Sequence, residues 1–171
     1  MERAELEREL EAMHAESWGW ALACCARDRE LAEDALQSAY LRVLSGRARF
    51  DGHSSLRTWV FGVIRVTAME EARRRRTWTA RNTGAKSAMD ATDPSPGADA
   101  MVESSEQRVR LVDALAAMSP RQREVLQLVF YHDMTIEEAA RVMQVSLGSA
   151  RTHYERGKKA LARLLTSEEN R

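Results

Sequence analysis

The sequence has 171 residues, a length that fits one domain or two small ones. Because 44% of the residues are hydrophobic and 30% are charged, we expect a packed core and exclude a disordered chain. With 6% aromatic residues, 3 prolines and 8 glycines, the composition favours an all-α fold and excludes a collagen-like or β-rich one. No apolar run approaches the roughly 20 residues of a spanning helix, and no signal peptide opens the chain, so we expect a cytoplasmic protein without membrane insertion.

The net charge is zero, but the charges alternate along the chain. Residues 1–40 hold 10 acidic and 4 basic side chains, and residues 41–81 hold 3 acidic and 10 basic ones. Residues 82–119 are acidic again and residues 120–171 are slightly basic. This pattern predicts two anion-binding surfaces on a chain that also presents negative charge to a basic partner.

Hydrophobic residues at helical spacing predict three helices in an N-terminal domain, residues 1–76. The first carries Leu10 and Ala21, and the second covers residues 31–44. The third is capped by Ser54 or Ser55 and ends in the four arginines of residues 73–76. Periodicity then disappears over residues 77–104, where Asn, Asp, Gly, Pro and Ser accumulate, so we expect a flexible linker there.

Better-marked helix boundaries characterise a C-terminal domain, residues 105–168. A first helix there carries Val109 on its expected core face, and capping-box patterns beginning at Ser119 and at Thr135 each predict the start of a further helix. A turn at Gln144 precedes a last, longer helix that Ser146 can cap. A short helix, a tight turn and a longer helix with a polar outer face are typical of a helix-turn-helix, whose second helix enters the major groove of DNA.

Two segments could bind nucleic acid. The outer face of the last helix carries serine, threonine, histidine and arginine, which bind bases and phosphates. The four arginines follow a loop with Phe50, Gly52 and His53, and such a combination suits unstacked bases and phosphates. The alternative for both segments is a solvated face of a helical bundle.

We find no pattern of a catalytic or metal site. Adjacent carboxylates on a helix diverge by about 100°, and the four histidines are scattered without metal-ligand spacing. The neighbouring Cys24 and Cys25 lie in an apolar stretch, which indicates two buried thiols rather than a redox pair. We therefore expect a protein that is not an enzyme and needs no metal or cofactor.

Two groups of residues, in this order along the chain, resemble a known family, the extracytoplasmic-function sigma factors. Residues 32–37, 50–60 and 73–76 resemble region 2 of these proteins, and residues 114–126 with the helix-turn-helix after Thr135 resemble region 4. The resemblance implies a bacterial transcription initiation factor. It would bind core RNA polymerase through the β′ clamp helices and the β subunit, direct it to promoter DNA, promote strand opening and be inhibited by an anti-sigma factor.

The resemblance also implies roles for individual residues. The polymerase-binding residues would be Glu33, Asp34, Leu36, Gln37 and Tyr40. The minus-10 element would be bound by Phe50, Asp51, Gly52, His53, Ser54, Ser55, Arg65, Arg73 and Arg74. The minus-35 element would be bound by Ser149, Arg151, Thr152, His153 and Arg156.

Five positions depart from the family's usual residues. Ser38 stands where Glu is usual, Val66 where Asn is common, His153 where Arg is frequent and Gln144 where a turn Gly is frequent. Gly157 stands where Ala is usual and should cost the helix about 1 kcal/mol.

Two other functions compete with a sigma factor. A conventional helix-turn-helix regulator would bind operator duplex without polymerase, usually as a dimer, and the sequence offers no heptad seam for one. A protein-binding helical adaptor would use the arginines only as a solvated face.

Overall fold

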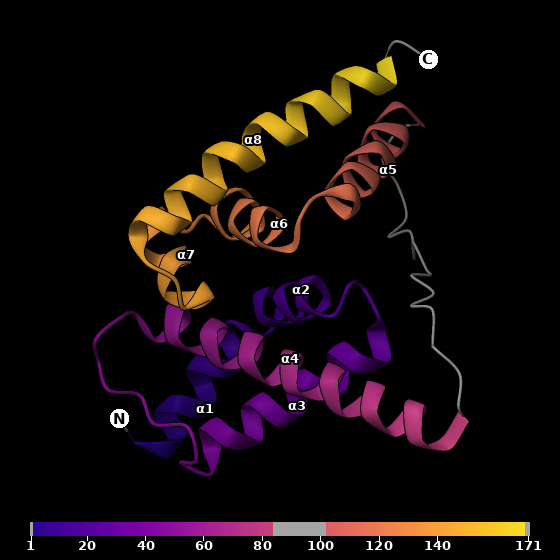
Figure 1. The fold of residues 1–171 in the computed structure, drawn as a ribbon. Coiled ribbons are helices and arrows are strands. Elements are labelled where there is room, and N and C mark those ends of the chain that lie inside the picture. Colours follow the sequence, from indigo (N-terminus) through magenta and orange to yellow (C-terminus); the bar gives the residue numbers. More distant parts are fainter. Residues whose placement is uncertain (1, 84–101, 170–171) are drawn as a thin grey trace. The chain divides into compact units, whose positions relative to one another are not determined.

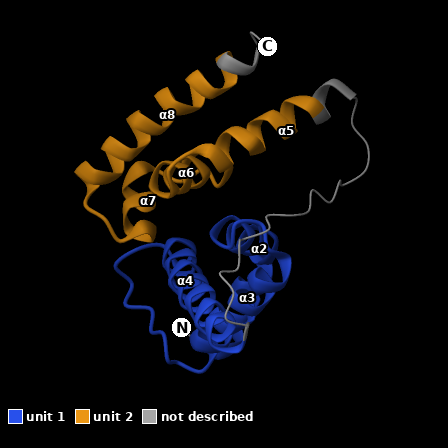
Figure 2. Cartoon of the chain, turned by 45° about the vertical axis from the view of Figure 1, so that its right-hand side comes forward, with its two compact units in different colours: residues 1–93 blue, residues 94–171 orange. Residues whose placement is uncertain are grey.

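The computed structural model describes residues 2–83 and 102–169, which form helices and turns with no strand among them (Figure 1). The chain divides into two compact units, residues 1–93 and 94–171 (Figure 2). The predicted all-α class with two small helical domains is confirmed, whereas the predicted domain and linker boundaries stay a prediction. No helix in the described ranges is long and apolar enough to cross a membrane.

The N-terminal unit contains α1 (Arg3–Ala12), α2 (His14–Cys24), α3 (Arg29–Leu44) and α4 (Leu56–Thr83). The first predicted helix is in fact two helices, because Met13 leaves the helical conformation with φ −96° and ψ 10°. Helices α2, α3 and α4 pack against one another around Trp20, Phe61 and Ile64, which are fully buried. The Trp20 indole donates a hydrogen bond to the Phe61 carbonyl at 3.0 Å, and the two rings stack.

Helix α4 is longer than predicted. It continues seven residues beyond Arg76, so the expected helix end is wrong. Residues 77–83 contain neither glycine nor proline. Just before them, Arg75 pairs with Asp28, the N-cap residue of α3, at 2.9 Å and with Glu30 on α3 at 3.0 Å. At the other end of the expected linker, a helix already begins at Val102. The rest of the expected linker, residues 84–101, lies outside the described residues.

The C-terminal unit contains α5 (Val102–Ala117), α6 (Pro120–Leu126), the π-helical turn η1 (Gln127–Tyr131), α7 (Ile136–Met143) and α8 (Leu147–Glu169). Helices α5, α6 and α7 all pack against α8. Val109, expected in the core, is 53% exposed, whereas Ala114 of the same helix is buried. Ser119 precedes Pro120 at the N-terminus of α6, but its side chain makes no capping bond, so the capping box predicted there is wrong.

Gly157 explains how closely α6 and α8 approach. A Cβ atom at this position would lie 3.3 Å from the Cδ1 atom of Leu126 and 3.4 Å from the Cβ atom of Gln122. The glycine costs about 1 kcal/mol in helix propensity relative to alanine. The lack of a side chain at Gly157 lets α8 pack closely on α6, which explains why glycine stands here despite this cost.

Candidate nucleic-acid interfaces

The exposed face of α3 carries most of the predicted polymerase-binding residues. Asp28 caps the helix by accepting a hydrogen bond from the Leu31 backbone N–H at 3.0 Å. Glu33, Asp34 and Gln37 then lie exposed on the surface. The structure therefore places three of the five predicted side chains where a partner can reach them.

Leu36 and Tyr40 lie differently from these three. Leu36 is only 4% exposed and belongs to the core. Tyr40 is half-buried, its hydroxyl oxygen lies 3.4 Å from His14 Nδ1, and burial raises its pKa. Sequence reasoning also missed Leu41, which is 67% exposed and follows Gln37 by four residues on the same side of α3.

The loop before α4 is held by short-range contacts. The Phe50 ring lies 5.4 Å from the Trp59 ring, centroid to centroid. Asp51 Oδ1 accepts a hydrogen bond from the His53 backbone N–H at 3.1 Å, and Gly52 adopts a φ of 77°. Asp51, Gly52 and His53 are exposed, so the loop presents a polar tip next to a half-buried aromatic ring.

Ser55 is the capping residue of α4. Its Oγ atom accepts a hydrogen bond from the Thr58 backbone N–H at 3.1 Å and donates one to the Thr58 hydroxyl at 2.8 Å. Ser54 donates instead to the Ser55 carbonyl at 3.1 Å. Of the two predicted capping serines, the cap is therefore Ser55.

The three predicted arginines of α4 do not share one environment. Arg65 is only 5% exposed, so the structure does not bring it to the surface with the loop. Arg73 and Arg74 are exposed. About 25 Å of helix separates them from the loop, because Arg73 follows Leu56 by 17 positions at 1.5 Å each.

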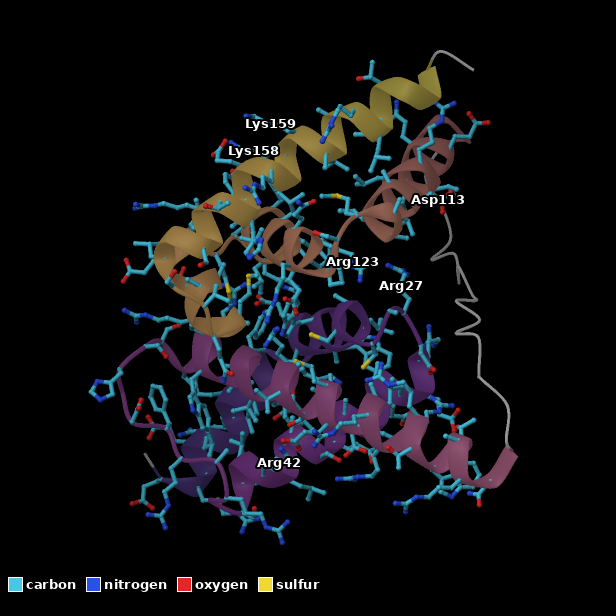
Figure 3. The ribbon with its side chains drawn as sticks, viewed as in Figure 1. Arg27, Arg42, Asp113, Arg123, Lys158 and Lys159 are labelled. Atoms are coloured by element: carbon cyan, nitrogen blue, oxygen red, sulfur yellow. The ribbon has the colours of Figure 1, made fainter. Side chains whose placement is uncertain are left out.

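Ion pairs between α3 and α4 lie beside Arg73 and Arg74. Arg42 on α3 (Figure 3) hydrogen-bonds Glu70, and this bond lowers the pKa of Glu70, with further lowering from the charges of Arg42, Arg73 and Arg74. Glu71 binds Ser38 and Arg74, each at 3.2 Å. Ser38 therefore stabilises the contact between the two helices.

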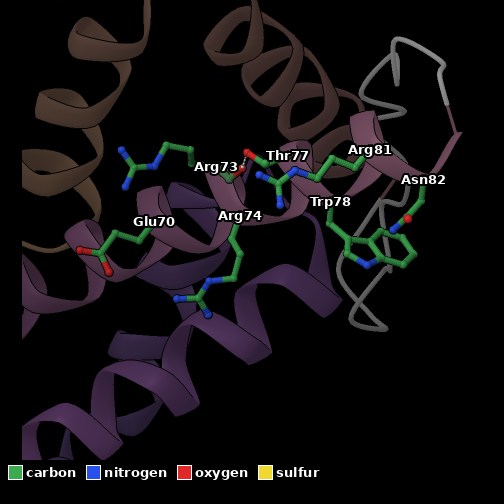
Figure 4. Close-up of a pocket in the computed structure, with 7 residues that line it drawn as sticks. All are labelled: Glu70, Arg73, Arg74, Thr77, Trp78, Arg81 and Asn82. Carbon is green, nitrogen blue, oxygen red and sulfur yellow. Dashed lines mark hydrogen bonds between the residues drawn. The ribbon is translucent and has the colours of Figure 1, made fainter.

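The last turns of α4 contain residues that sequence reasoning assigned to the linker. A hollow on this helix is lined by Glu70, Arg73, Arg74, Thr77, Trp78, Arg81 and Asn82 (Figure 4). Trp78 is 66% exposed. The helical spacing of Arg74, Trp78 and Arg81 was a usable sequence signal, because residues three and four apart share one side of a helix.

A helix-turn-helix occupies the C-terminal unit as predicted. Thr135 caps α7 by accepting from the Glu138 backbone N–H at 3.1 Å, and the Glu138 carboxylate accepts from the Thr135 backbone N–H at 2.8 Å. Gln144 then turns the chain with a φ of 56°. Ser146 caps α8 by accepting from the Ser149 backbone N–H at 3.1 Å.

The first turns of α8 expose four of the five predicted minus-35 residues. Arg151 and Arg156 are exposed and form no ion pair with any described residue. The hydroxyls of Ser149 and Thr152 are exposed but bond within the helix start, to the Ser146 hydroxyl at 2.9 Å and to the Gly148 carbonyl at 3.0 Å. His153 is half-buried.

The basic residues further along α8 lie beyond this group. Lys158 and Lys159 follow on the same helix (Figure 3). Lys158 pairs with Glu155 at 3.0 Å, and its Nζ atom lies 4.5 Å from the Tyr154 ring centroid. Arg151 and Arg156 are therefore more available to an anion than Lys158.

No metal site is found within residues 2–83 and 102–169, and the two cysteines differ in burial. No three His, Cys, Asp or Glu side chains are grouped there so as to hold a metal ion. Cys25 is buried, and burial together with the charge of Asp28 raises its thiol pKa to about 12. Cys24 is half-buried, so the prediction of two buried thiols holds only for Cys25.

Comparison with known proteins gives matches in both units. The family described as Sigma-70 region 2 matches residues 11–79, and Sigma-70 region 4 matches residues 108–161. The ECF RNA polymerase sigma factor SigX of Bacillus subtilis is 30% identical over 137 residues, which cover 79% of this chain and 71% of SigX. The RNA polymerase sigma factor CarQ of Myxococcus xanthus is 30% identical over 163 residues, or 92% of this chain and 87% of CarQ.

A solved structure has the same fold. The sigma factor RpoE of Bartonella quintana, in its co-crystal with the anti-sigma factor NepR, superposes with a TM-score of 0.74 at 20% identity. The match covers 95% of this chain and 97% of that one.

Proposed function

The chain belongs to the extracytoplasmic-function sigma factors of the sigma-70 family, and from that premise we propose which residues of each unit contact polymerase and promoter. It is a transcription initiation factor that binds core RNA polymerase and directs it to promoters. The N-terminal unit binds polymerase and the minus-10 element, and the C-terminal unit binds the minus-35 element. We keep 1–76 and 105–168 as the two domains and 77–104 as the linker, with α4 and α5 each extending into the linker range.

Polymerase binding uses the exposed face of α3. Glu33, Asp34 and Gln37 contact the clamp helices of the β′ subunit, with Tyr40 at the edge of the contact, and the chain reaches the β subunit as well. Their exposure supports this assignment. Leu36 acts indirectly, because its burial fixes α3 against the core.

Minus-10 binding uses the loop of residues 50–55, whose Phe50 and exposed polar tip suit an unpaired base. Arg73 and Arg74 contact phosphate further along α4. Arg65 is assigned here only by the resemblance, and its burial supports a positioning role within the unit.

One observation supports minus-35 binding by the C-terminal unit. Arg151 and Arg156 lie in the first turns of α8, the second helix of the helix-turn-helix. Both are exposed, and neither forms an ion pair with a described residue. Arginine forms bidentate hydrogen bonds to guanine in the major groove. Ser149, Thr152 and His153 follow the side of α8 that carries Arg156, at spacings of three and four residues, and complete the contact with base edges and phosphates.

Run-off transcription with purified core polymerase tests this function. Wild type should produce specific start sites on promoter fragments from its own genome. Arg151→Ala and Arg156→Ala should each lower use of those promoters about tenfold, in line with 1–3 kcal/mol for a bidentate base contact. The matched control is Arg110→Ala, which removes an exposed arginine from α5 and should change nothing.

The outcomes separate the competing functions. If no start site appears and the chain does not co-elute with core polymerase, a duplex-binding regulator is favoured. If polymerase binding and start sites survive both arginine changes, the C-terminal assignment is wrong, and a protein-binding role for that unit takes its place.

Three further proposals follow from the family. Its members are transcription factors rather than enzymes, and we propose that this chain has no catalytic activity and uses no cofactor. We place it in the cytoplasm, where RNA polymerase works. RpoE of Bartonella quintana was crystallised with an anti-sigma factor, and we propose that such an inhibitor covers the polymerase- and DNA-binding faces of this chain too.

A further inference from the structure

We propose that the last turns of α4 form a binding site for single-stranded DNA, in which Trp78 stacks on an unpaired base and Arg74 and Arg81 bind neighbouring phosphates. The inference rests on the proposed function, because that function places the N-terminal unit where promoter strands separate. It adds a site about 33 Å along α4 from the loop of residues 50–55, since 22 residues at 1.5 Å each separate Leu56 from Trp78.

The spacing along α4 brings the three side chains together. Trp78 follows Arg74 by four residues and precedes Arg81 by three, so all three lie on one side of the helix with neighbouring Cβ atoms about 5–6 Å apart. They line the hollow of α4 with Arg73 and Thr77. Figure 4 shows the Arg74 and Trp78 side chains projecting downward from the helix.

Trp78 differs from the other three tryptophans in its contacts. Trp20 is buried against Phe61, the ring of Trp59 contacts Phe50, and Trp18 lies under the guanidinium group of Arg29. The Trp78 indole is 66% exposed and contacts no ring or cation among the described residues. A large apolar ring exposed to water beside two arginines is an available stacking surface, and bases use such surfaces.

The charge around this ring favours a polyanion. Arg73 and Arg81 form no ion pair with a described residue, and Arg74 pairs only with Glu71 while remaining 67% exposed. Arg74 is the exposed partner of this pair, so phosphate can still reach its guanidinium group. The nearby Glu70 is already bound by Arg42, which further reduces the negative charge offered here.

A single strand fits this arrangement better than a duplex. In a duplex both faces of each base lie within the stack, so the indole would have no base to contact. Arg74 and Arg81 are separated by about 10 Å of helix, so a short stretch of one strand can reach both of them. A short unpaired stretch could therefore place a phosphate at each arginine and a base on Trp78.

Fluorescence anisotropy with the full chain tests the site directly. The probe is a fluorescein-labelled oligonucleotide of twelve thymidines, compared with a duplex of the same length. Trp78→Ala should weaken binding of the single strand at least about fivefold, whereas Trp78→Phe should retain most of it. Arg81→Ala should reduce the slope of log affinity against log salt by about 0.7.

Arg76→Ala is the matched control. It removes an exposed guanidinium from the same part of α4, but from a side turned about 140° from the middle of the hollow. It should affect the single strand less than Arg81→Ala does. Duplex binding should be the same for wild type and Trp78→Ala.

Each outcome supports or overturns the site. The proposal is wrong if wild type does not bind the single strand at low salt, if Trp78→Ala binds it as wild type does, or if that change weakens duplex binding equally. Failure of wild type to initiate with core polymerase would instead overturn the proposed function. Normal initiation combined with an unaffected Trp78→Ala variant would overturn this inference alone.

Discussion

Gln144 turns the chain between α7 and α8 with a φ of 56°, a left-handed conformation that is strained for a residue with a side chain. Glycine adopts this conformation without the steric penalty, although it also loses more entropy on folding. We predict that Gln144→Gly raises the free energy of unfolding of the C-terminal unit by about 0.5 kcal/mol, the strain relieved less the added entropy.

Urea unfolding followed by circular dichroism measures this change, because all four tryptophans lie in the N-terminal unit and their fluorescence does not report on the other one. The control is Arg141→Gly, an exposed position inside α7, which should lower the stability by about 1 kcal/mol. If Gln144→Gly instead lowers the free energy of unfolding, the glutamine side chain stabilises the turn by more than the relief of backbone strain does.

Contacts between near neighbours in the sequence are the ones that could be predicted. The caps formed by Ser55, Thr135 and Ser146 join residues only three positions apart. The bond from Trp20 to the Phe61 carbonyl spans 41 positions, and nothing in either segment specifies the other. The Ser119 side chain does not form the capping bond that its sequence pattern predicts, so even a local pattern leaves the side-chain rotamer undetermined.

At the scale of elements, α4 shows what hydrophobic periodicity cannot indicate. Apolar periodicity ends near Ala72, but the helix continues to Thr83, because residues 77–83 contain no glycine or proline and Arg75 pairs with the N-cap residue Asp28 and with Glu30 of α3. Sequence reasoning therefore assigned Trp78 to a linker. The exposed faces of α3 and α8 were predictable because their polar residues alternate with buried ones at helical spacing.

The pairing of α3 with α4 should depend on pH. Arg42 lowers the pKa of Glu70, so the pair stabilises the fold while Glu70 is ionised, above its unfolded pKa of about 4.5. This stabilisation is lost as pH falls through the lower folded pKa. We predict that Arg42→Ala lowers the free energy of unfolding by about 0.5 kcal/mol near pH 7, since the pair is partly exposed.

Tryptophan fluorescence during urea unfolding measures this difference in the N-terminal unit. The difference in free energy of unfolding between wild type and Arg42→Ala should disappear once Glu70 is protonated in the folded protein. Arg47→Ala, an exposed arginine without an ion pair among the described residues, serves as the control and should show no such pH dependence. A gap that persists in acid would mean that Arg42 stabilises the unit through packing of its aliphatic stem.

At the scale of the whole molecule, zero net charge conceals a division of function. The acidic excess of residues 1–40 lies on α1 to α3, which include the proposed polymerase-binding face, and the basic excess of residues 41–81 lies on the loop and α4. One unit thus presents opposite charges to two partners. This division was predictable from charge counts alone, because it follows chain order.

The length of chain between the two units limits whether both can bind their promoter elements without polymerase. Promoter elements two helical turns apart are separated by about 70 Å, and a 28-residue linker behaving as a coil would span roughly 30 Å. Because α4 continues to Thr83 and α5 begins at Val102, the chain between them can span at most about 65 Å when fully stretched. Stretching a chain this far reduces its entropy, which polymerase can offset by binding it.

We therefore predict that the isolated chain binds promoter duplex weakly, with less than about tenfold preference over a scrambled fragment, whereas the polymerase complex should prefer the promoter by at least about a thousandfold. A salt titration of binding to both fragments, with and without core polymerase, measures the two ratios. A fragment with the minus-35 element alone is the control, and the isolated chain should bind it as well as the full promoter. Tight, promoter-specific binding by the isolated chain would show that its two units engage both elements unaided, and that polymerase is not what brings them together on DNA.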